Sequence, residues 1–170
     1  MKTAVFANSK GGVGKSTIAL LASLSLATRY NRAKVELIDL DPQATTSDSL
    51  SRFANHRFNV VNNEEFSLGS ATPNNSRIIS HLESISSDNL SECYSILDCP
   101  AGNEPQKSTF LLHSNIIFIP TSVSDADVFA TKKYISSLIE LFDSNIENSP
   151  KKSPLAVILP SMIDHRDELN

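Results

Sequence analysis

A glycine-rich stretch near the start of the chain carries the residues best suited to bind an anion. It reads Ser9-Lys10-Gly11-Gly12-Val13-Gly14-Lys15-Ser16-Thr17. Its glycines can take positive φ, so the backbone can wrap closely around a phosphate and point N–H groups at the phosphate oxygens. Lys15 adds a mobile positive charge, and Ser16 adds a hydroxyl that can reach Mg²⁺. These residue types at this spacing predict a phosphate-binding loop.

The elements on either side of this loop are those that such a site requires. The sequence predicts an apolar strand over residues 3–8 and a helix from about Ser16 to Arg29. In the order strand, turn, helix, the free N–H groups and the positive end of the helix dipole face the anion. Apolar side chains occur all round this helix, so we expect it to be buried on every side.

Three carboxylates follow at the ends of later predicted strands. The second strand, residues 34–41, ends in Asp39 and Asp41, and a later strand, residues 94–98, ends in Asp98. Ligands of open α/β sheets bind at the carboxyl ends of the strands, so these acids should meet the phosphate loop. A carboxylate there can hold Mg²⁺ through water, because this ion keeps much of its hydration shell.

These motifs resemble those of one ATPase family. The K-G-G-x-G-K-[ST] pattern, with Lys10 before the glycines and Ser9 in place of the usual glycine, is the deviant Walker A motif of the ParA/MinD family. Asp39-Leu40-Asp41-Pro42-Gln43 matches the family's D-x-D-P-Q element, and Asp98-Cys99-Pro100-Ala101-Gly102 resembles its Walker B element. The resemblance implies an α/β fold, namely a P-loop NTPase three-layer sandwich with a mostly parallel, doubly wound sheet.

The resemblance also implies roles for single residues, with ATP and Mg²⁺ as ligands. Lys10, Lys15 and Asp41 are the implied catalytic residues. In the family, the lysine at the position of Lys10 crosses a dimer interface to the partner's nucleotide, and the acid at the position of Asp41 orients the attacking water. The implied nucleotide-binding residues are Lys10, Gly11, Gly12, Val13, Gly14, Lys15, Ser16 and Thr17, and the implied metal-binding residues are Ser16, Asp39 and Asp98.

The activity implied by the resemblance is hydrolysis of ATP to ADP and phosphate. The leading hypothesis is a ParA-like partition ATPase that hydrolyses ATP slowly as a dimerisation switch. It would position or segregate plasmid or chromosomal DNA with a ParB-like adaptor protein, and non-specific DNA is a further candidate partner. Two alternatives stay open, a MinD-like positioning ATPase and a non-catalytic nucleotide-binding interaction module.

The composition of the chain bears on its domain organisation, its location and its possible nucleic-acid or membrane partners. The chain has 170 residues, 40% of them hydrophobic, and a net charge of −4, which favours one globular domain over residues 1–170 and gives no overall basic field for nucleic acid. We expect a cytoplasmic protein with two buried thiols, Cys93 and Cys99, and no membrane partner, because residues 162–170 are too short and acidic for an amphipathic anchor. The histidines share no metal-ligand spacing.

The remaining segments are predicted from their periodicity. Residues 47–53 and 77–85 should be helical, and residues 58–61, 115–121 and 154–159 should be strands. A helix capped by Ser124 should run to Phe142, with an apolar stripe of Val128, Ile135, Leu138, Ile139 and Phe142. Members of the family usually continue with a further helix–strand–helix portion, so the sheet is expected to be short at its C-terminal end. They also often have Asn where this chain has Pro160-Ser161, so neither adenine contacts nor DNA binding are carried over from the family.

Overall fold

A single parallel sheet forms the centre of the molecule. The computed structural model describes residues 1–51, 54, 57–67, 73–86, 92–145 and 153–162. Six parallel strands lie in the order β3-β2-β4-β1-β5-β6. Their bounds are β1 Lys2–Phe6, β2 Lys34–Asp39, β3 Phe58–Val61, β4 Cys93–Asp98, β5 Ile116–Thr121 and β6 Leu155–Pro160.

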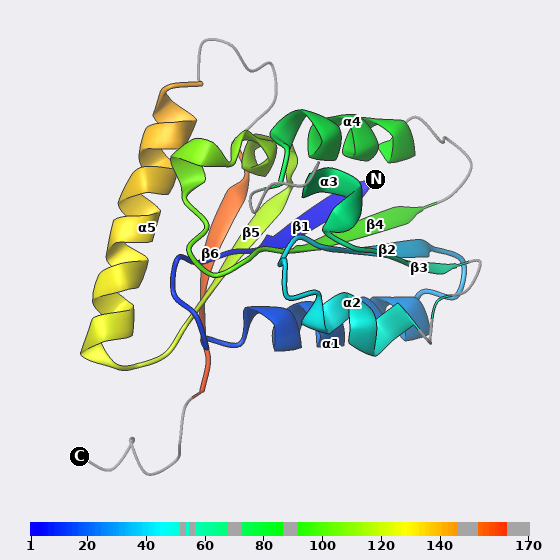
Figure 1. Cartoon of the computed structure of the whole chain (residues 1–170), viewed down its shortest axis with the longest axis horizontal. Coiled ribbons are helices and arrows are strands. Elements are labelled where there is room, and N and C mark those ends of the chain that lie inside the picture. The colour runs from blue at the N-terminus through cyan, green and yellow to red at the C-terminus, as the bar shows by residue number, and fades with distance from the viewer. Residues whose placement is uncertain (52–53, 55–56, 68–72, 87–91, 146–152, 163–170) are drawn as a thin grey trace.

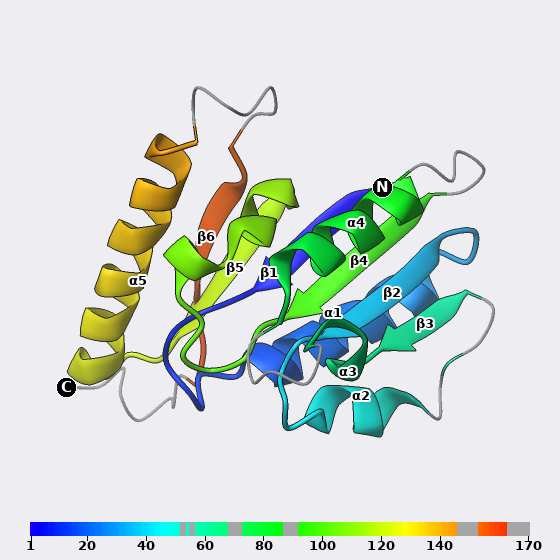
Figure 2. The ribbon, with the colours of Figure 1, turned by 45° about the horizontal axis from the view of Figure 1, so that its top comes forward.

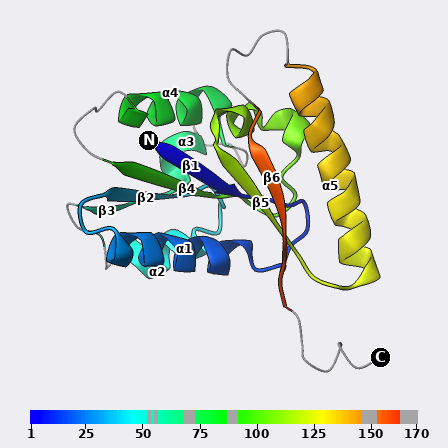
Figure 3. The same cartoon turned by 180° about the vertical axis from the view of Figure 1, so that it is seen from behind.

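Helices cover both faces of this sheet (Figures 1 and 2). On one face lie α1 (Lys15–Arg29) and α2 (Thr45–Leu50). On the other lie α3 (Glu64–Ser67), α4 (Asn75–Ser86) and α5 (Asp125–Asp143), with the 3₁₀ turns η2 (Pro105–Lys107) and η3 (Thr109–His113). Viewed from behind, α1 and α5 lie on opposite sides of the strands (Figure 3).

The alternation of side chains along each strand divides the apolar core in two. Phe6, Leu37 and Ile96 pack with α1 and α2, whereas Val5 and Leu97 pack with α4, η3 and α5. A strand buried on both faces reads as a continuous apolar run, which is why β1, β2 and β4 were recognisable from sequence. The predicted three-layer α/β fold is therefore confirmed, and every strand pair in the described sheet is parallel.

The prediction that the first helix is buried on every side is wrong. Its fully buried residues are Lys15, Ala19 and Ser23, which lie four residues apart on one face, and Leu21 is 59% exposed. Small residues on the inner face let α1 approach the sheet closely, while several of its leucines pack only partly against the core.

The predicted apolar stripe of α5 is also displaced. The helix begins as predicted, because the Ser124 hydroxyl accepts a hydrogen bond from the Asp127 N–H. Its buried residues, however, are Thr131, Tyr134, Leu138 and Leu141, and Val128 and Ile139 are exposed. The buried hydroxyls of Thr131 and Tyr134 hydrogen-bond to Asn8, Thr121 and Asn103, so polar contacts as well as apolar ones determine this face.

Other predicted elements are found with shifted ends. The helix expected over 47–53 corresponds to α2, and residues 52–53 of the predicted range lie outside the described residues. The strand expected over 58–61 is β3. The helix expected over 77–85 is the longer α4, while α3, η2 and η3 were not predicted. Most of residues 162–170 lie outside the described part of the chain. Among the described helices none has the length and apolar character of a membrane span.

The cysteines and one histidine, to which sequence analysis assigned no functional role, have structural positions in the fold. Cys93 and Cys99 are buried thiols. His81 on α4 forms an ion pair with Glu36 on β2, with 2.8 Å between Nε2 and Oε2. The hydrogen bond with Glu36 raises the pKa of His81 above its ordinary value, although partial burial of the ring opposes the shift. This pair joins a helix to the sheet.

We expect the His81–Glu36 pair to make stability depend on pH. A histidine whose pKa is raised by folding contributes its full stabilisation below the unfolded value of 6.5, and that contribution is lost as pH rises through the folded value. His81→Gln should therefore reduce the free energy of unfolding by about 1 kcal/mol at pH 6 and by less at pH 8.5. Urea unfolding at both pH values measures this, and an equal loss at both would contradict the pair.

Candidate functional site

The phosphate loop leaves β1 and enters α1 in the predicted order. Gly12 and Gly14 have φ of 75° and 85°, so both use the left-handed conformation that glycine tolerates, whereas Gly11 does not. Gly14 precedes the helix, and its carbonyl accepts the first helical bond from the Ile18 N–H at 2.9 Å. The N–H groups of the first helical turn therefore lie at the end of the loop, as an anion site requires.

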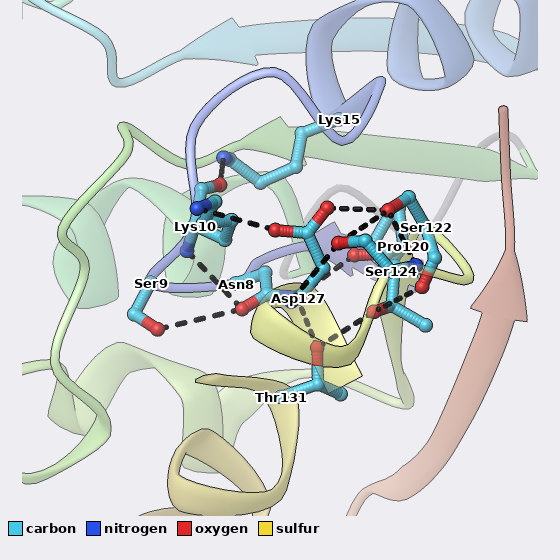
Figure 4. A network of polar contacts seen from close by, with 10 residues as sticks. Asn8, Ser9, Lys10, Lys15, Pro120, Ser122, Ser124, Asp127 and Thr131 are labelled. Atoms are coloured by element: carbon cyan, nitrogen blue, oxygen red, sulfur yellow. Dashed lines mark hydrogen bonds and ion pairs between the residues drawn. The ribbon is translucent and has the colours of Figure 1, made fainter. Parts of the chain in front are cut away.

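Lys15 is held over this loop. Its side chain is only 6% exposed, and Nζ donates a 2.8 Å hydrogen bond to the carbonyl oxygen of Lys10 (Figure 4). Burial lowers the pKa of Lys15, while the negative charge of Asp98 opposes this shift most strongly. The ammonium group thus has a protein acceptor now and can exchange it for a phosphate oxygen.

The acids at the strand tips are brought together by the register of the sheet. Asp39 and Asp98 are direct partners in the β2–β4 ladder, and Asp98 also pairs with Phe6, two residues before Asn8 and the loop. Both carboxylates are 0% exposed. The sequence therefore correctly placed Asp39 and Asp98 at one edge with the phosphate loop.

Asp98 has one occupied and one open oxygen. Its Oδ2 accepts a 2.9 Å hydrogen bond from Thr46 Oγ1, whereas its buried Oδ1 has no hydrogen-bond partner among the described residues. Burial raises the pKa of Asp98 to about 6, and the hydroxyls of Ser16 and Thr46 oppose the rise. An unsatisfied buried carboxylate oxygen is costly, and a hydrated cation near Ser16 would supply the missing partner.

Asp39 has no such open position. Oδ1 accepts from the Asp41 N–H at 3.1 Å, and Oδ2 accepts from the Ser47 N–H at 2.7 Å. Desolvation raises the pKa of Asp39, while these two backbone bonds favour its ionised form. In this structure Asp39 therefore shapes the turn that carries Asp41 and fixes the start of α2. Its support of Mg²⁺ stays a prediction.

Asp41 lies beside an open cleft. It is partly exposed, and its Oδ1 accepts from the Gln43 N–H at 2.9 Å. With Pro42, Gly102 and Phe110 it helps to line a cavity of about 500 Å³ between the β2 and β4 loops and η3. A water held in such a cleft can reach a carboxylate, which is the geometry that a water-orienting role needs.

The loop after Asp98 contacts the phosphate loop directly. The Gly102 N–H donates to the Ser9 carbonyl at 2.8 Å, and a Cβ on Gly11 would lie 3.6 Å from Cβ of Ala101. On the other side, Ser161 Oγ donates to the Val13 carbonyl at 2.7 Å. Both neighbours thus contact the phosphate loop through its carbonyl groups.

Lys10 is tied to the body of the protein at both ends (Figure 4). Its N–H donates to Asn8 Oδ1 at 3.2 Å, and its Nζ lies 3.2 Å from Asp127 Oδ1 at the start of α5. Sequence reasoning predicted the helix that begins after Ser124 but gave no functional role to Asp127, Asn8 or Thr46. A polar Asn ending an apolar strand was the one local signal for Asn8.

No group of three or more His, Cys, Asp or Glu side chains in the described part of the chain is arranged to hold a metal ion. The donor set at the sheet edge is instead one open carboxylate, Asp98, beside the Ser16 hydroxyl. Mg²⁺ suits such a sparse set, because it keeps several waters and takes further oxygen ligands from substrate phosphates.

Comparisons with known proteins agree with this geometry. A family model described as an AAA domain matches residues 1–84. The virulence plasmid ParA family protein pGP5-D of Chlamydia psittaci is 48% identical over 50 residues. The MinD cell division protein of Aquifex aeolicus superposes with a TM-score of 0.67 at 16% identity, covering 98% of this chain and 71% of that one. The predicted resemblance to the ParA/MinD family is confirmed.

A second solved structure with a similar fold contains a bound nucleotide. Cobyrinic acid a,c-diamide synthase of Mycobacterium smegmatis, with a bound ATP analogue and magnesium, gives a TM-score of 0.67 at 20% identity and covers 98% of this chain and 77% of that one. The aligned segment of pGP5-D is 29% of this chain and 19% of that relative's length. At these identities the solved structures establish the fold.

We expect Thr46→Val to destabilise the protein through Asp98. The variant keeps the shape of the side chain but removes the donor to Asp98 Oδ2, the oxygen of this buried carboxylate that has a described partner. The cost should be about 1–3 kcal/mol, measured by chemical unfolding. Thr46→Ser keeps the hydroxyl and should retain most of the stability. Unchanged stability in Thr46→Val would show that the bond to Asp98 contributes nothing to folding.

Proposed function

We propose that this chain is a ParA-like ATPase that binds ATP with Mg²⁺ and hydrolyses it slowly. The observation that carries the proposal is the open Oδ1 of Asp98, buried at a strand tip next to Lys15 and the glycine-rich loop. This pairing of a cation site with an anion site fits a metal–polyphosphate ligand. The named relatives support it, since one belongs to the ParA family and one solved neighbour holds an ATP analogue with magnesium.

Each residue of the proposed site has a distinct task. Gly11 to Thr17 would surround the phosphates with N–H groups, and Lys15 would move from the Lys10 carbonyl to the β- and γ-phosphates. Ser16 and Asp98 would hold Mg²⁺, which when bound neutralises charge on the phosphates. Asp39 would support the site indirectly, because it accepts a hydrogen bond from the N–H of Asp41 and so orders the turn that carries Asp41. Asp41 would orient the attacking water in the adjacent cleft.

Lys10 extends the proposal to a dimer. Lys15 already supplies a cation to the loop of its own chain, so the second lysine would have a different task. We propose that Lys10 reaches the nucleotide of a second copy, as the family resemblance implies. A cation delivered by the partner follows the logic of an arginine finger, in which hydrolysis waits for assembly. ATP would then hold two copies together, and its hydrolysis would release them.

The proposed cellular task is positioning. A dimer that lasts only while ATP is intact can act as a timer for a bound cargo, and the plasmid ParA relative favours DNA as that cargo. A ParB-like adaptor, non-specific DNA and a cytoplasmic location belong to the same proposal. MinD-like positioning of a cell division protein is the nearest variant, and it uses the same site.

Lys15→Ala should weaken ATP binding by about a hundredfold or more. The change removes a buried ammonium group for which charge-assisted bonds to phosphate would be worth about 3 kcal/mol. Titration with a fluorescent ATP analogue in the presence of Mg²⁺ measures the affinity. Lys2→Ala, at the opposite end of β1, is the matched control and should bind as the unaltered chain does. Unchanged affinity in Lys15→Ala would refute the assignment of the loop.

Asp41→Ala should keep ATP binding and slow hydrolysis by about 10²–10⁴-fold. Molar mass by light scattering, with Mg²⁺–ATP and with Mg²⁺–ADP, then tests the switch in this trapped variant. We expect a dimer with ATP and a monomer with ADP. A monomer in both, with ATP bound, would favour the non-catalytic interaction module. Wild-type turnover in Asp41→Ala would remove Asp41 from the mechanism.

A further inference from the structure

Lys10 is held in place by contacts within its own chain. The ion pair from its Nζ to Asp127 Oδ1 spans 3.2 Å, with 44% of the lysine side chain and 15% of the aspartate side chain exposed. The pair joins the phosphate loop to the first turn of α5, more than a hundred residues later in the sequence (Figure 4). A lysine in this position is directed toward α5 of its own chain.

Asp127 is prepared to receive this lysine. Its N–H donates to the Ser124 hydroxyl at 3.2 Å, and its Oδ2 accepts a hydrogen bond from Ser122 Oγ. The Ser122 hydroxyl is the main reason why the pKa of Asp127 lies below its ordinary value, and Lys10 contributes to the same shift. The positive end of the helix dipole also favours a negative charge in this turn. Asp127 is therefore a fixed, ionised acceptor.

Buried hydrogen bonds of Asn8 connect the phosphate loop to β5 and α5 next to this ion pair. Asn8, which is 0% exposed, donates from Nδ2 to the Pro120 carbonyl at 2.8 Å and to Thr131 Oγ1 at 3.0 Å. Its Oδ1 accepts from the Lys10 N–H. Thr131 lies four residues after Asp127, so both are on the same face of α5. Buried hydrogen bonds thus connect the entry of the loop to α5.

We propose that Asp127 is a positioning residue that holds Lys10 against its own chain, and that Lys10 must leave Asp127 before it can reach the nucleotide of a second copy. The second half of this inference rests on the proposed function; the first half concerns the free chain alone. The contact with Asp127 directs the ammonium group toward its own chain, so the side chain would have to turn away from α5 to reach a second copy. Asp127 therefore competes with dimer formation and sets the protein concentration at which ATP assembles the dimer.

The exposure of the pair limits the size of the effect. Ion pairs that are partly open to solvent are worth little, so release of Lys10 should change an equilibrium by about two- to fivefold. An ion pair of this strength can break when the phosphates of a nucleotide offer Lys10 more negative charge. Without nucleotide, the pair would disfavour formation of the dimer. We expect Asp127→Asn, which keeps the size and hydrogen-bonding ability of the side chain, to remove this effect.

The first measurement follows the reaction of Lys10 with an amine-specific acylating reagent in the nucleotide-free protein, read by mass spectrometry. Lys10 should be labelled about two- to fivefold faster in Asp127→Asn than in the unaltered chain. Asp125→Asn is the control, because it removes an equal charge from the same helical turn but leaves the Lys10 contact intact. Equal labelling rates in all three proteins would overturn the inference.

The second measurement is the dimerisation constant with Mg²⁺–ATP by sedimentation or light scattering. Asp127→Asn should dimerise at about two- to fivefold lower protein concentration, and adding the same change to Lys10→Gln should have no further effect. Faster labelling with weaker dimerisation would mean that Asp127 serves the dimer, which overturns the release step. If every variant, including the unaltered chain, binds ATP yet stays monomeric, the proposed dimer falls, while the labelling result still decides whether Asp127 holds Lys10.

Discussion

The carboxyl edge of the sheet depends on three charges that are buried next to one another. Moving a charge out of water costs several kcal/mol unless the protein supplies partners. Asp39 receives two backbone N–H groups, Lys15 donates to a loop carbonyl, and Asp98 receives one hydroxyl and the nearby charge of Lys15. Only Asp98 is left with an oxygen that has no partner among the described residues. The described residues therefore leave one buried carboxylate oxygen unpaired, and the proposed Mg²⁺ would bind there.

The register of the central strands makes this arrangement possible. Asp98 pairs with Asp39 on one side and with Phe6 on the other, so β4 places its terminal acid between the turn that carries Asp41 and the phosphate loop. A slip of one residue would turn each side chain to the opposite face and move Asp98 away from Lys15. The apolar runs of β1, β2 and β4 oppose such a slip, because both faces of these strands are buried.

Local motifs explain why so much of the site could be predicted from the sequence. The loop from Lys10 to Thr17 is contiguous, and the rule that parallel strands end at one edge brought Asp39 and Asp98 to it without knowledge of the strand order. Asn8, Thr46 and Asp127 could not be found in this way, because their partners are distant in sequence. Asn8 and Thr131 are 123 residues apart. The stripe of α5 was mispredicted for the same reason, since a threonine that hydrophobicity alone would leave at the surface is buried by its bond to Asn8.

The two contacts between α5 and the loop differ in how easily they break. The Asn8–Thr131 bond is buried, and opening it would leave two polar groups without water, at a cost of about 1–3 kcal/mol. The Lys10–Asp127 pair is partly open to solvent, and separating its groups should cost about 1 kcal/mol or less. The helix can therefore stay docked while the lysine exchanges partners. A change of charge at the loop need not move the sheet, the helix or the core, and only one side chain has to be released for the site to face a second molecule.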